Sequence, residues 1–388
     1  MKFIDLFCGI GGFHQALASL GAECVFASDI DKECRKVYFD NYKLEPVGDI
    51  TQVNEADIPP HNILCAGFPC QAFSKAGKQL GTEDSRGTLF YDIVRIAKHH
   101  QPEYLLLENV RNLASHDGGN TWKVIRNSLR EIGYSVPDQP IIFSPHYIGT
   151  PQYRERVFIL CVRKDIGETP DFTFDKTSLP TCDAYSILQN DSEIENIEKY
   201  RLSDEETRLI DLWNDFLQNI SKPYPGFPVW SEWLRELKPS DRLSQYPQWK
   251  QTFIRKNSQL YVNNKLFMDK WLRKASTLGN FFGAKAKLEW QAGQPDMPDL
   301  WNTIMQFRPS GIRAKQPSYY PALVAITQTS VVGERRRYLT PRECANLQGF
   351  PKTMKLHPKD AVAYKQLGNS VNVNVVKMFA KLLLEPQS

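Results

Sequence analysis

The stretch Phe3-Ile-Asp-Leu-Phe-Cys-Gly-Ile-Gly-Gly-Phe13 joins an apolar run to three glycines near the start of the chain. The run Phe3–Phe7 predicts a β-strand, and we expect a helix after the glycines that extends through Leu20. Glycines between a strand and a helix let the backbone approach a ligand at the helix N-terminus. Their spacing is not G-x-G-x-x-G, which argues against a nicotinamide oxidoreductase.

Short apolar runs alternate with amphipathic stretches through the first 165 residues. Further strands are predicted at Glu23–Ser28, Asn62–Ala66, Tyr104–Glu108 and Arg156–Val162, and helices near Lys32–Asn41, Leu89–His99 and Thr121–Ile132. This order predicts an α/β fold, a Rossmann-like, doubly wound and mostly parallel sheet with a second, smaller domain. In such sheets ligands bind outside the carboxyl ends of the strands.

The alternation stops after Lys164, and seven of the eight tryptophans fall between Trp213 and Trp301. From Tyr338 it returns: Thr340-Pro-Arg-Glu343 is typical of a capped helix start, and a last helix is expected at Asn372–Leu384. We therefore expect one domain at 1–168, a second at 169–335, and a return to the first at 336–388.

The net charge of +4 is unevenly distributed. Residues 171–241 hold 15 acidic and 7 basic side chains, whereas residues 242–340 hold 16 basic and 5 acidic ones. The basic half indicates a phosphate-bearing partner, and a solvated surface with no ligand is the alternative.

No apolar run is long enough to span a bilayer, and the N-terminus enters a strand pattern directly, so we expect a cytoplasmic protein without a membrane partner. The eight cysteines form no CxxC pair and the seven histidines lack ligand spacing. We expect neither a disulfide framework nor a bound metal.

Polar residues at the ends of the predicted strands are candidates for ligand binding. Asp29 and Asp31 follow the second strand, where a carboxylate can accept hydrogen bonds from ribose hydroxyls, and Asp49 follows Gly48. A tight turn with capping aspartates would look the same. Cys70 in Gly67-Phe-Pro-Cys-Gln71 is either a nucleophile or a small buried side chain, and the motif alone leaves both open.

Six motifs occur in a fixed order: Phe3–Phe13, Gly67-Phe-Pro-Cys-Gln71, Glu108-Asn-Val110, Gln152-Tyr-Arg-Glu-Arg156, Arg342-Glu-Cys-Ala-Asn-Leu-Gln-Gly-Phe-Pro351 and Gln366-Leu-Gly-Asn-Ser-Val371. Together they closely resemble the DNA (cytosine-5) methyltransferases, the modification enzymes of bacterial restriction systems. The resemblance covers roughly 1–165 and 335–385. It makes the first and last segments a catalytic and cofactor-binding domain, and 169–335 a target recognition domain.

The resemblance implies methyl transfer from S-adenosyl-L-methionine to C5 of a cytosine flipped out of a specific duplex DNA sequence. Cys70 matches the nucleophile that attacks C6, and Glu108 matches the carboxyl group that bonds the base edge. Arg154 matches the arginine that orients the base, with Arg156 beside it in a supporting role. The implied cofactor contacts are Phe7, Gly9, Gly11, Gly12, Asp29, Ile30, Asp49, Ile50, Pro69, Asn369, Ser370 and Val371. Asp29-Ile30 departs from the acid–tryptophan pair frequent in the family, and this bears on cofactor affinity.

Two segments are expected to contact DNA. The glycine-rich stretch 71–87 resembles a loop that closes over DNA, with Gln71, Ser74, Lys75 and Arg86 as contacts. Arg308-Pro-Ser-Gly-Ile-Arg-Ala-Lys315 combines a turn with the cations Arg308, Arg313 and Lys315. The expected partner is double-stranded DNA in the nucleoid, bound by a monomer, with a restriction endonuclease encoded nearby but not physically associated.

A tRNA cytosine-5 methyltransferase is the leading alternative, because the catalytic motifs are shared and the substrate is selected elsewhere. The long basic insert favours DNA. A non-catalytic DNA-binding regulator is less consistent with the presence of both Cys70 and Glu108. An amino-methyltransferase would need a polar Pro-Pro-aromatic loop in place of Pro69-Cys70. The target DNA sequence cannot be read from the chain.

Overall fold

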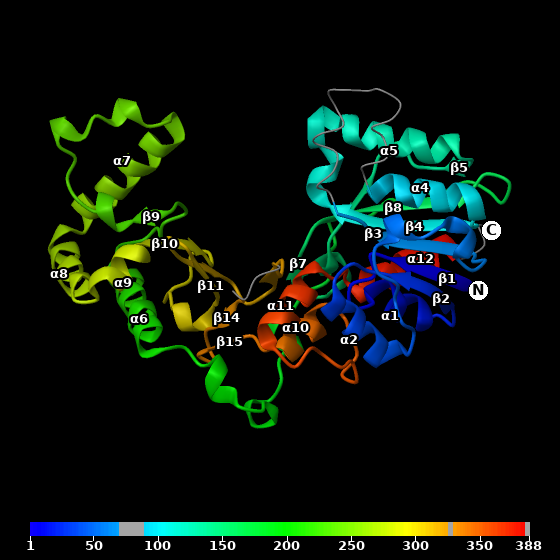
Figure 1. Ribbon diagram of the computed structural model, residues 1–388. Coiled ribbons are helices and arrows are strands. Elements are labelled where there is room, and N and C mark those ends of the chain that lie inside the picture. Colours follow the sequence, from blue (N-terminus) through cyan, green and yellow to red (C-terminus); the bar gives the residue numbers. More distant parts are fainter. Residues whose placement is uncertain (70–88, 325–328, 385–388) are drawn as a thin grey trace. The chain divides into compact units, whose positions relative to one another are not determined.

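The computed structural model describes residues 1–69, 89–324 and 329–384. The chain forms two compact units, each shown in Figure 1. The first comprises Met1–Cys182, Pro321–Thr327 and Pro341–Ser388, and the second Asp183–Tyr320 and Gln328–Thr340. These divisions fall 14 and 5 residues after the boundaries expected at 168 and 335. A short return to the first unit at Pro321–Thr327 was not expected from the sequence.

The described part of the first unit contains a seven-stranded sheet with the order β2-β1-β3-β4-β8-β5, in which β6 also pairs with β8. Its strands are β1 Lys2–Leu6, β2 Glu23–Ser28, β3 Ile63–Gly67, β4 Tyr104–Val110, β5 Tyr134–Ser135, β6 Ile141–Phe143 and β8 Arg156–Arg163. Strands β1 to β4 pair in parallel, whereas β8 runs antiparallel to β4, β5 and β6. The predicted α/β class with a mostly parallel sheet is confirmed, with an antiparallel edge added.

Helices cover both faces of this sheet (Figure 1). Their bounds are α1 Gly12–Ala18, α2 Lys32–Tyr42, α4 Leu89–His100, α5 Asn120–Glu131, α10 Pro341–Leu347, α11 Asp360–Asn369 and α12 Val373–Leu384, and a short strand β7 lies at Gln152–Tyr153. Helices α4 and α5 bury Ile93 and Ile125 in one cluster with strand residues such as Leu105. On the opposite face, Phe379 of α12 lies 4.7 Å from Phe158 of β8, ring centre to ring centre.

The second unit packs helices against a mixed sheet with the order β15-β14-β11-β12-β10-β9. Its helices are α6 Asp204–Asn219, α7 Gln248–Asn263, α8 Lys265–Ser276 and α9 Gly279–Ala284, and its strands are β9 Val229–Trp230, β10 Lys287–Gln291, β11 Ile304–Arg308, β12 Gly311–Lys315, β14 Val331–Val332 and β15 Arg337–Tyr338, with β13 Tyr320–Pro321 at the crossing to the first unit. Trp213 and Trp271 are fully buried in the core. Across the described ranges of both units, no helix is long and apolar enough to cross a membrane.

A glycine allows β10 and β12 to approach each other closely. Gly311 pairs with Lys287 in the parallel register, and a Cβ at Gly311 would lie 1.9 Å from the carbonyl oxygen of Lys287. A side chain at this position cannot be accommodated without separating the strands.

We therefore expect Gly311→Ala to lower the free energy of unfolding by about 1–3 kcal/mol, the usual cost of overpacking. Urea unfolding measures the change. Gly226→Ala is the matched control, because a Cβ there has no neighbour within 4 Å. Equal effects of the two substitutions would contradict the tight strand contact.

Candidate active site

The turn after β1 depends on glycine. Phe7, Gly9 and Gly11 have φ values of 55°, 53° and 89°, in the region that side chains rarely adopt. A Cβ at Gly11 would lie 2.2 Å from the Tyr42 ring, and one at Gly12 would lie 2.5 Å from Cγ2 of Val371. The turn can therefore pack between α2 and the segment after α11 only because these side chains are missing.

Asp29 links the ends of β1 and β2. Its Oδ2 accepts a hydrogen bond from the Gly9 amide at 2.8 Å, and its Oδ1 accepts one from the Asp31 amide at 2.8 Å. Burial raises the pKa of Asp29 above its ordinary value, although both backbone bonds act in the opposite direction. The carboxyl group thus fixes the turn at the same edge of the sheet as the glycines.

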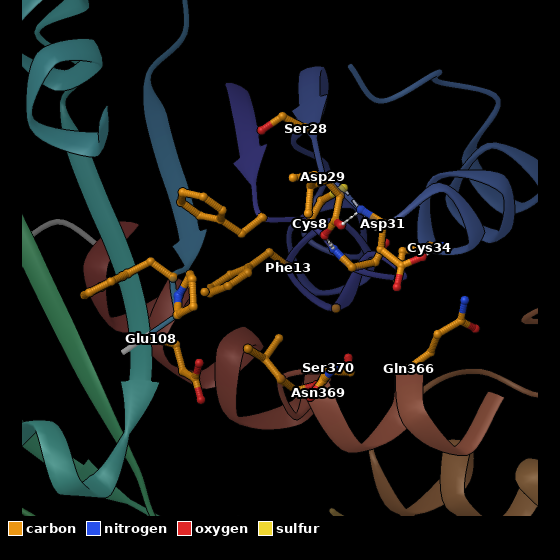
Figure 2. A pocket seen from close by; sticks show the side chains of 18 of the residues that line it. Cys8, Phe13, Ser28, Asp29, Asp31, Cys34, Glu108, Gln366, Asn369 and Ser370 are labelled. Atoms are coloured by element: carbon orange, nitrogen blue, oxygen red, sulfur yellow. Dashed lines mark hydrogen bonds between the residues drawn. The ribbon is translucent and has the colours of Figure 1, made fainter. Parts of the chain in front are cut away.

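A cavity of about 520 Å³ opens at the carboxyl ends of β1 to β4, within the size range of small-molecule sites. Of the twelve predicted cofactor contacts, eleven line it: Phe7, Gly9, Gly12, Asp29, Ile30, Asp49, Ile50, Pro69, Asn369, Ser370 and Val371. Gly11 does not line the cavity and packs against Tyr42 instead. In Figure 2, Asp29 and Glu108 lie in separate parts of the cavity.

The cavity is also lined by Asp31, a candidate from the sequence, and by residues that the sequence did not indicate: Cys8, Phe13, Ser28, Cys34, Gly48, Gly67, Phe68, Leu89, Asn109, Val110, Gln366 and Gly368. Most of them lie within, or next to, the motifs quoted above, so adjacency to a motif was the signal available. Cys34 and Leu89 carried no such signal, because they enter the cavity from helices α2 and α4.

The polar and apolar groups at this end of the cavity suit a nucleoside. Asp29 offers a carboxylate near the glycine turn, and Ile30 is 75% exposed, which leaves an apolar surface free for a base. Asp49 uses its Oδ1 to accept from the amide and the hydroxyl of Thr51, at 3.0 and 2.9 Å. Ser28 is buried with no partner for its hydroxyl among the described residues, so it can also serve a ligand.

Glu108 on β4 is the acidic group at the other part of the cavity. It pairs in register with Gly67 of β3, and a Cβ on Gly67 would lie 3.6 Å from Glu108 Oε2. Its Oε1 lies 3.1 Å from Nε of Arg156. Burial raises the pKa of Glu108 above its ordinary value, and the charges of Arg156 and Arg154 only partly oppose this.

Asn109 connects β4 to the segment that leads into Cys70. Its Nδ2 donates to the Phe68 carbonyl at 2.8 Å, and its Oδ1 accepts from the Val110 amide at 2.8 Å. Asn109 is buried, so the bond to Phe68 is shielded from water. It fixes the backbone two residues before Cys70.

Arg154 donates to three backbone carbonyls through its two terminal nitrogens, whereas its buried Nε has no partner among the described residues. Nη1 donates to Leu323 at 2.8 Å, and Nη2 donates to Gly368 and Ser370 at 2.9 Å each. Its side chain is buried, and burial lowers the pKa of Arg154 to about 9. Arg156 is more exposed and makes the direct contact to Glu108.

Arg154 and Arg156 make different contacts in the structure. The sequence comparison gave Arg154 the base-orienting role and Arg156 a supporting one. In the structure, the Arg154 guanidinium holds the cavity loop, while Arg156 contacts the carboxyl group of Glu108. These contacts are made in the absence of a base, so the base-orienting role of Arg154 stays a prediction.

The remaining predicted residues lie elsewhere. Cys70, Gln71, Ser74, Lys75 and Arg86 fall outside the described residues. Arg308, Arg313 and Lys315 belong to β11 and β12 of the second unit. Among the described residues, no three His, Cys, Asp or Glu side chains are grouped so as to hold a metal ion.

Comparison with known proteins follows the same motifs. The family model described as C-5 cytosine-specific DNA methylase matches residues 1–385. The chain belongs to this family. The predicted resemblance and the enzyme class, a DNA cytosine-5 methyltransferase, are thereby confirmed.

Individual relatives cover nearly the whole chain. The Type II methyltransferase M.AluI of Cellulosimicrobium cellulans is 36% identical over 97% of this chain and 90% of its own. M.HhaI of Haemophilus parahaemolyticus is 35% identical over 98% and 93%. The crystal structure of the S. pombe Dnmt2 methyltransferase shares the fold, with a TM-score of 0.53, 19% identity, and coverage of 100% and 99%.

The two arginines of this methylase should behave differently when removed. Arg154→Met deletes hydrogen bonds to three carbonyls and should lower the free energy of unfolding by about 3 kcal/mol or more. Arg156→Met should cost about 1 kcal/mol, because Glu108 can take up a proton when its partner is lost. Urea denaturation of both variants measures the difference. Similar losses would contradict the structural role of Arg154.

Proposed function

We propose that this methylase transfers a methyl group from S-adenosyl-L-methionine to C5 of a flipped-out cytosine in a specific sequence of duplex DNA. The observation that carries the proposal is that one cavity holds two separate polar regions. Asp29 lies in the region suited to a nucleoside, and the buried carboxyl group of Glu108 lies in the other. A cofactor at one part and a cytosine at the other would bring the methyl donor and acceptor together.

The cofactor would supply an electrophilic methyl group, and Asp29, Asp49 and the turn at Gly9 would hold it. Gly12 and the loop at Asn369 would close the cavity around it, since a Cβ on Gly12 would fill the gap to Val371. Eleven of the twelve predicted contacts line one cavity, and this supports the assignment.

The proposed reaction begins at Cys70. Cytosine C5 is a weak nucleophile until a group adds to C6, and a thiolate can add there and leave again by elimination. The electron pair of the thiolate forms the S–C6 bond, and the displaced π pair of the C5–C6 bond moves to C5. C5 would then take the methyl group, and the sulfonium donor would leave as a neutral thioether. Loss of the C5 proton then expels the thiolate and restores the aromatic ring.

Glu108 would manage the charge during the attack. Because burial raises its pKa, the carboxyl group can carry a proton and share it with N3 of the base as negative charge develops. Such a contact requires the base to leave the helix stack, since N3 is paired inside duplex DNA. The raised pKa therefore fits both the chemistry and the need for base flipping.

Arg156 is a second candidate for orienting the base. It contacts Glu108 at 3.1 Å and keeps part of its surface exposed, so its remaining N–H groups can reach a base oxygen. Arg154 also holds the loop at Gly368 and Ser370 in place.

The family model, described as a C-5 cytosine-specific DNA methylase, supports DNA as the substrate, and the relatives are named Type II methyltransferases. We propose the corresponding role here: a modification enzyme of a restriction system, cytoplasmic, acting on nucleoid DNA as a monomer, with its endonuclease encoded separately. No observation favours tRNA as the substrate.

Bisulfite sequencing of host DNA and of host tRNA after expression of the chain tests the reaction and the substrate together. We expect protected cytosines at one short sequence, and none with Cys70→Ser, whose hydroxyl is a much weaker nucleophile towards C6. Retained DNA binding by the Ser variant is the control for folding. Protected cytosines confined to tRNA would replace DNA as the substrate, and methylation by Cys70→Ser at the wild-type rate would exclude the mechanism.

A mechanism-based trap tests Cys70 directly. Duplex DNA with 5-fluorocytosine at the mapped target lacks the C5 proton whose loss allows elimination, so the enzyme should remain covalently attached in the presence of the methyl donor. A shifted band on a denaturing gel reports the adduct. Unmodified DNA and Cys70→Ala are the controls, and a wild-type enzyme that turns over this substrate without an adduct would contradict covalent attack.

A further inference from the structure

The mixed sheet of the second unit has one apolar and one cationic face. Leu288, Trp290, Ile312, Ala314, Met305 and Phe307 belong to the buried core on one side. Their neighbours in β10, β11 and β12 alternate to the other side, since the strands are in register at Glu289–Arg313, Gln306–Arg313 and Lys287–Gly311. The charged side chains on this face are Lys287, Glu289, Arg308, Arg313 and Lys315, and we call them the cationic face.

A single carboxylate lies among the four cations of this face. Glu289 Oε1 lies 2.5 Å from Nζ of Lys287, and its Oε2 lies 2.5 Å from Nη2 of Arg313 and 3.6 Å from Nη1 of Arg308. Burial would raise the pKa of Glu289, but the bonds from Lys287 and Arg313 outweigh it and hold the pKa below its ordinary value. Glu289 is therefore ionised at neutral pH, and the face keeps an excess of positive charge.

Burial and the neighbouring cations act on Lys315 in the same direction. The pKa of its ammonium group is lowered, first by burial and then by the charges of Arg313 and Arg308. A bound anion would relieve this repulsion, so the cationic face is suited to phosphate groups.

Arg313 differs from the other cations because it is held in a fixed orientation. Both Nε and Nη2 donate to Glu289 Oε2, at 2.6 and 2.5 Å. The residues described in the structure offer Nη1 no partner, and 26% of the side chain is exposed. Because a guanidinium carries five N–H groups in a rigid fork, the outer edge of Nη1 and Nη2 remains available for a planar acceptor.

We propose that Arg313, buttressed by Glu289, reads a guanine in the major groove of the target DNA, while Arg308, Lys287 and Lys315 contact neighbouring phosphates. Guanine presents O6 and N7 side by side, the pair of acceptors that an arginine fork matches. Because the guanidinium is already oriented before binding, DNA binding does not pay the entropy cost of ordering it. A contact to a phosphate would not need such a fixed orientation. The proposal rests on the proposed function, and each target site contains a guanine because the target cytosine is paired with one.

The test uses the target duplex mapped by bisulfite sequencing. Each guanine is replaced in turn by 7-deazaguanine, which lacks only the N7 acceptor, and fluorescence anisotropy gives the Kd. We expect the wild-type enzyme to bind about tenfold more weakly when one particular guanine is replaced. Arg313→Lys keeps the charge but lacks the fixed planar fork, so its penalty for the same replacement should be clearly smaller than that of the wild-type enzyme.

A second variant separates the buttress from the fork. Glu289→Gln preserves the shape of the side chain but releases its charge-assisted hold on Arg313. We expect a smaller penalty for the same 7-deazaguanine, together with equal or tighter binding to unrelated duplexes, since a negative charge is lost from the face. Arg273→Ala, which removes an exposed cation from α8, is the matched control and should retain the full penalty.

Thermal unfolding shows which variants are folded. If Glu289→Gln does not fold, the binding measurements on Arg313→Lys alone test the proposal. The proposal is overturned if no 7-deazaguanine weakens the wild-type enzyme, or if Arg313→Lys keeps the wild-type penalty. It is also overturned if Arg313→Lys weakens binding to all duplexes equally, because that result identifies a phosphate contact. Failure of the proposed function is distinguishable, because the bisulfite map would then contain no target.

Discussion

A buried guanidinium that donates to backbone carbonyls of three distant residues holds the first unit together. Arg154 donates to carbonyls of Leu323, Gly368 and Ser370, which lie 169 to 216 residues away in the chain. The unit is assembled from separate stretches of sequence, so its returning segments must be attached at defined points. Burying a charge is costly unless it is hydrogen-bonded, and these three carbonyl bonds, which require the segments to meet at Arg154, offset part of that cost.

The same edge of the sheet gathers the reactive groups. Parallel pairing of β1 to β4 places their carboxyl ends together, and the register brings Glu108 beside Gly67. Asp29 then fixes the turn after β1, and Asn109 fixes the end of β3 through Phe68. In each of these bonds a side chain pairs a backbone amide or carbonyl group near the end of a strand. The same hydrogen bonds therefore shape the wall of the cavity.

Much of this arrangement could be predicted, because central parallel strands are continuous apolar runs. The run Leu105–Leu107 is fully buried, and only a strand flanked by helices on both faces makes such a run stable. Strands β5 and β6 have two and three residues, and α11 has a weakly amphipathic pattern, so local sequence gave little signal for them. The second unit lacks the βα alternation on which the prediction relied.

The roles of the arginines show where sequence reasoning ends. Arg154 and Arg156 are two residues apart and chemically identical, so spacing cannot tell which one meets Glu108. The answer depends on carbonyls supplied by Leu323 and by the loop after α11, which are distant in sequence. Counting the basic residues of the second unit likewise does not show which of them are paired with acidic groups. Lys274 and Lys265 are paired with Asp215 and Glu236, whereas Lys287, Arg308 and Arg313 of the cationic face share Glu289. Tertiary contacts therefore gather several basic residues of the second unit on one face that can attract a polyanion.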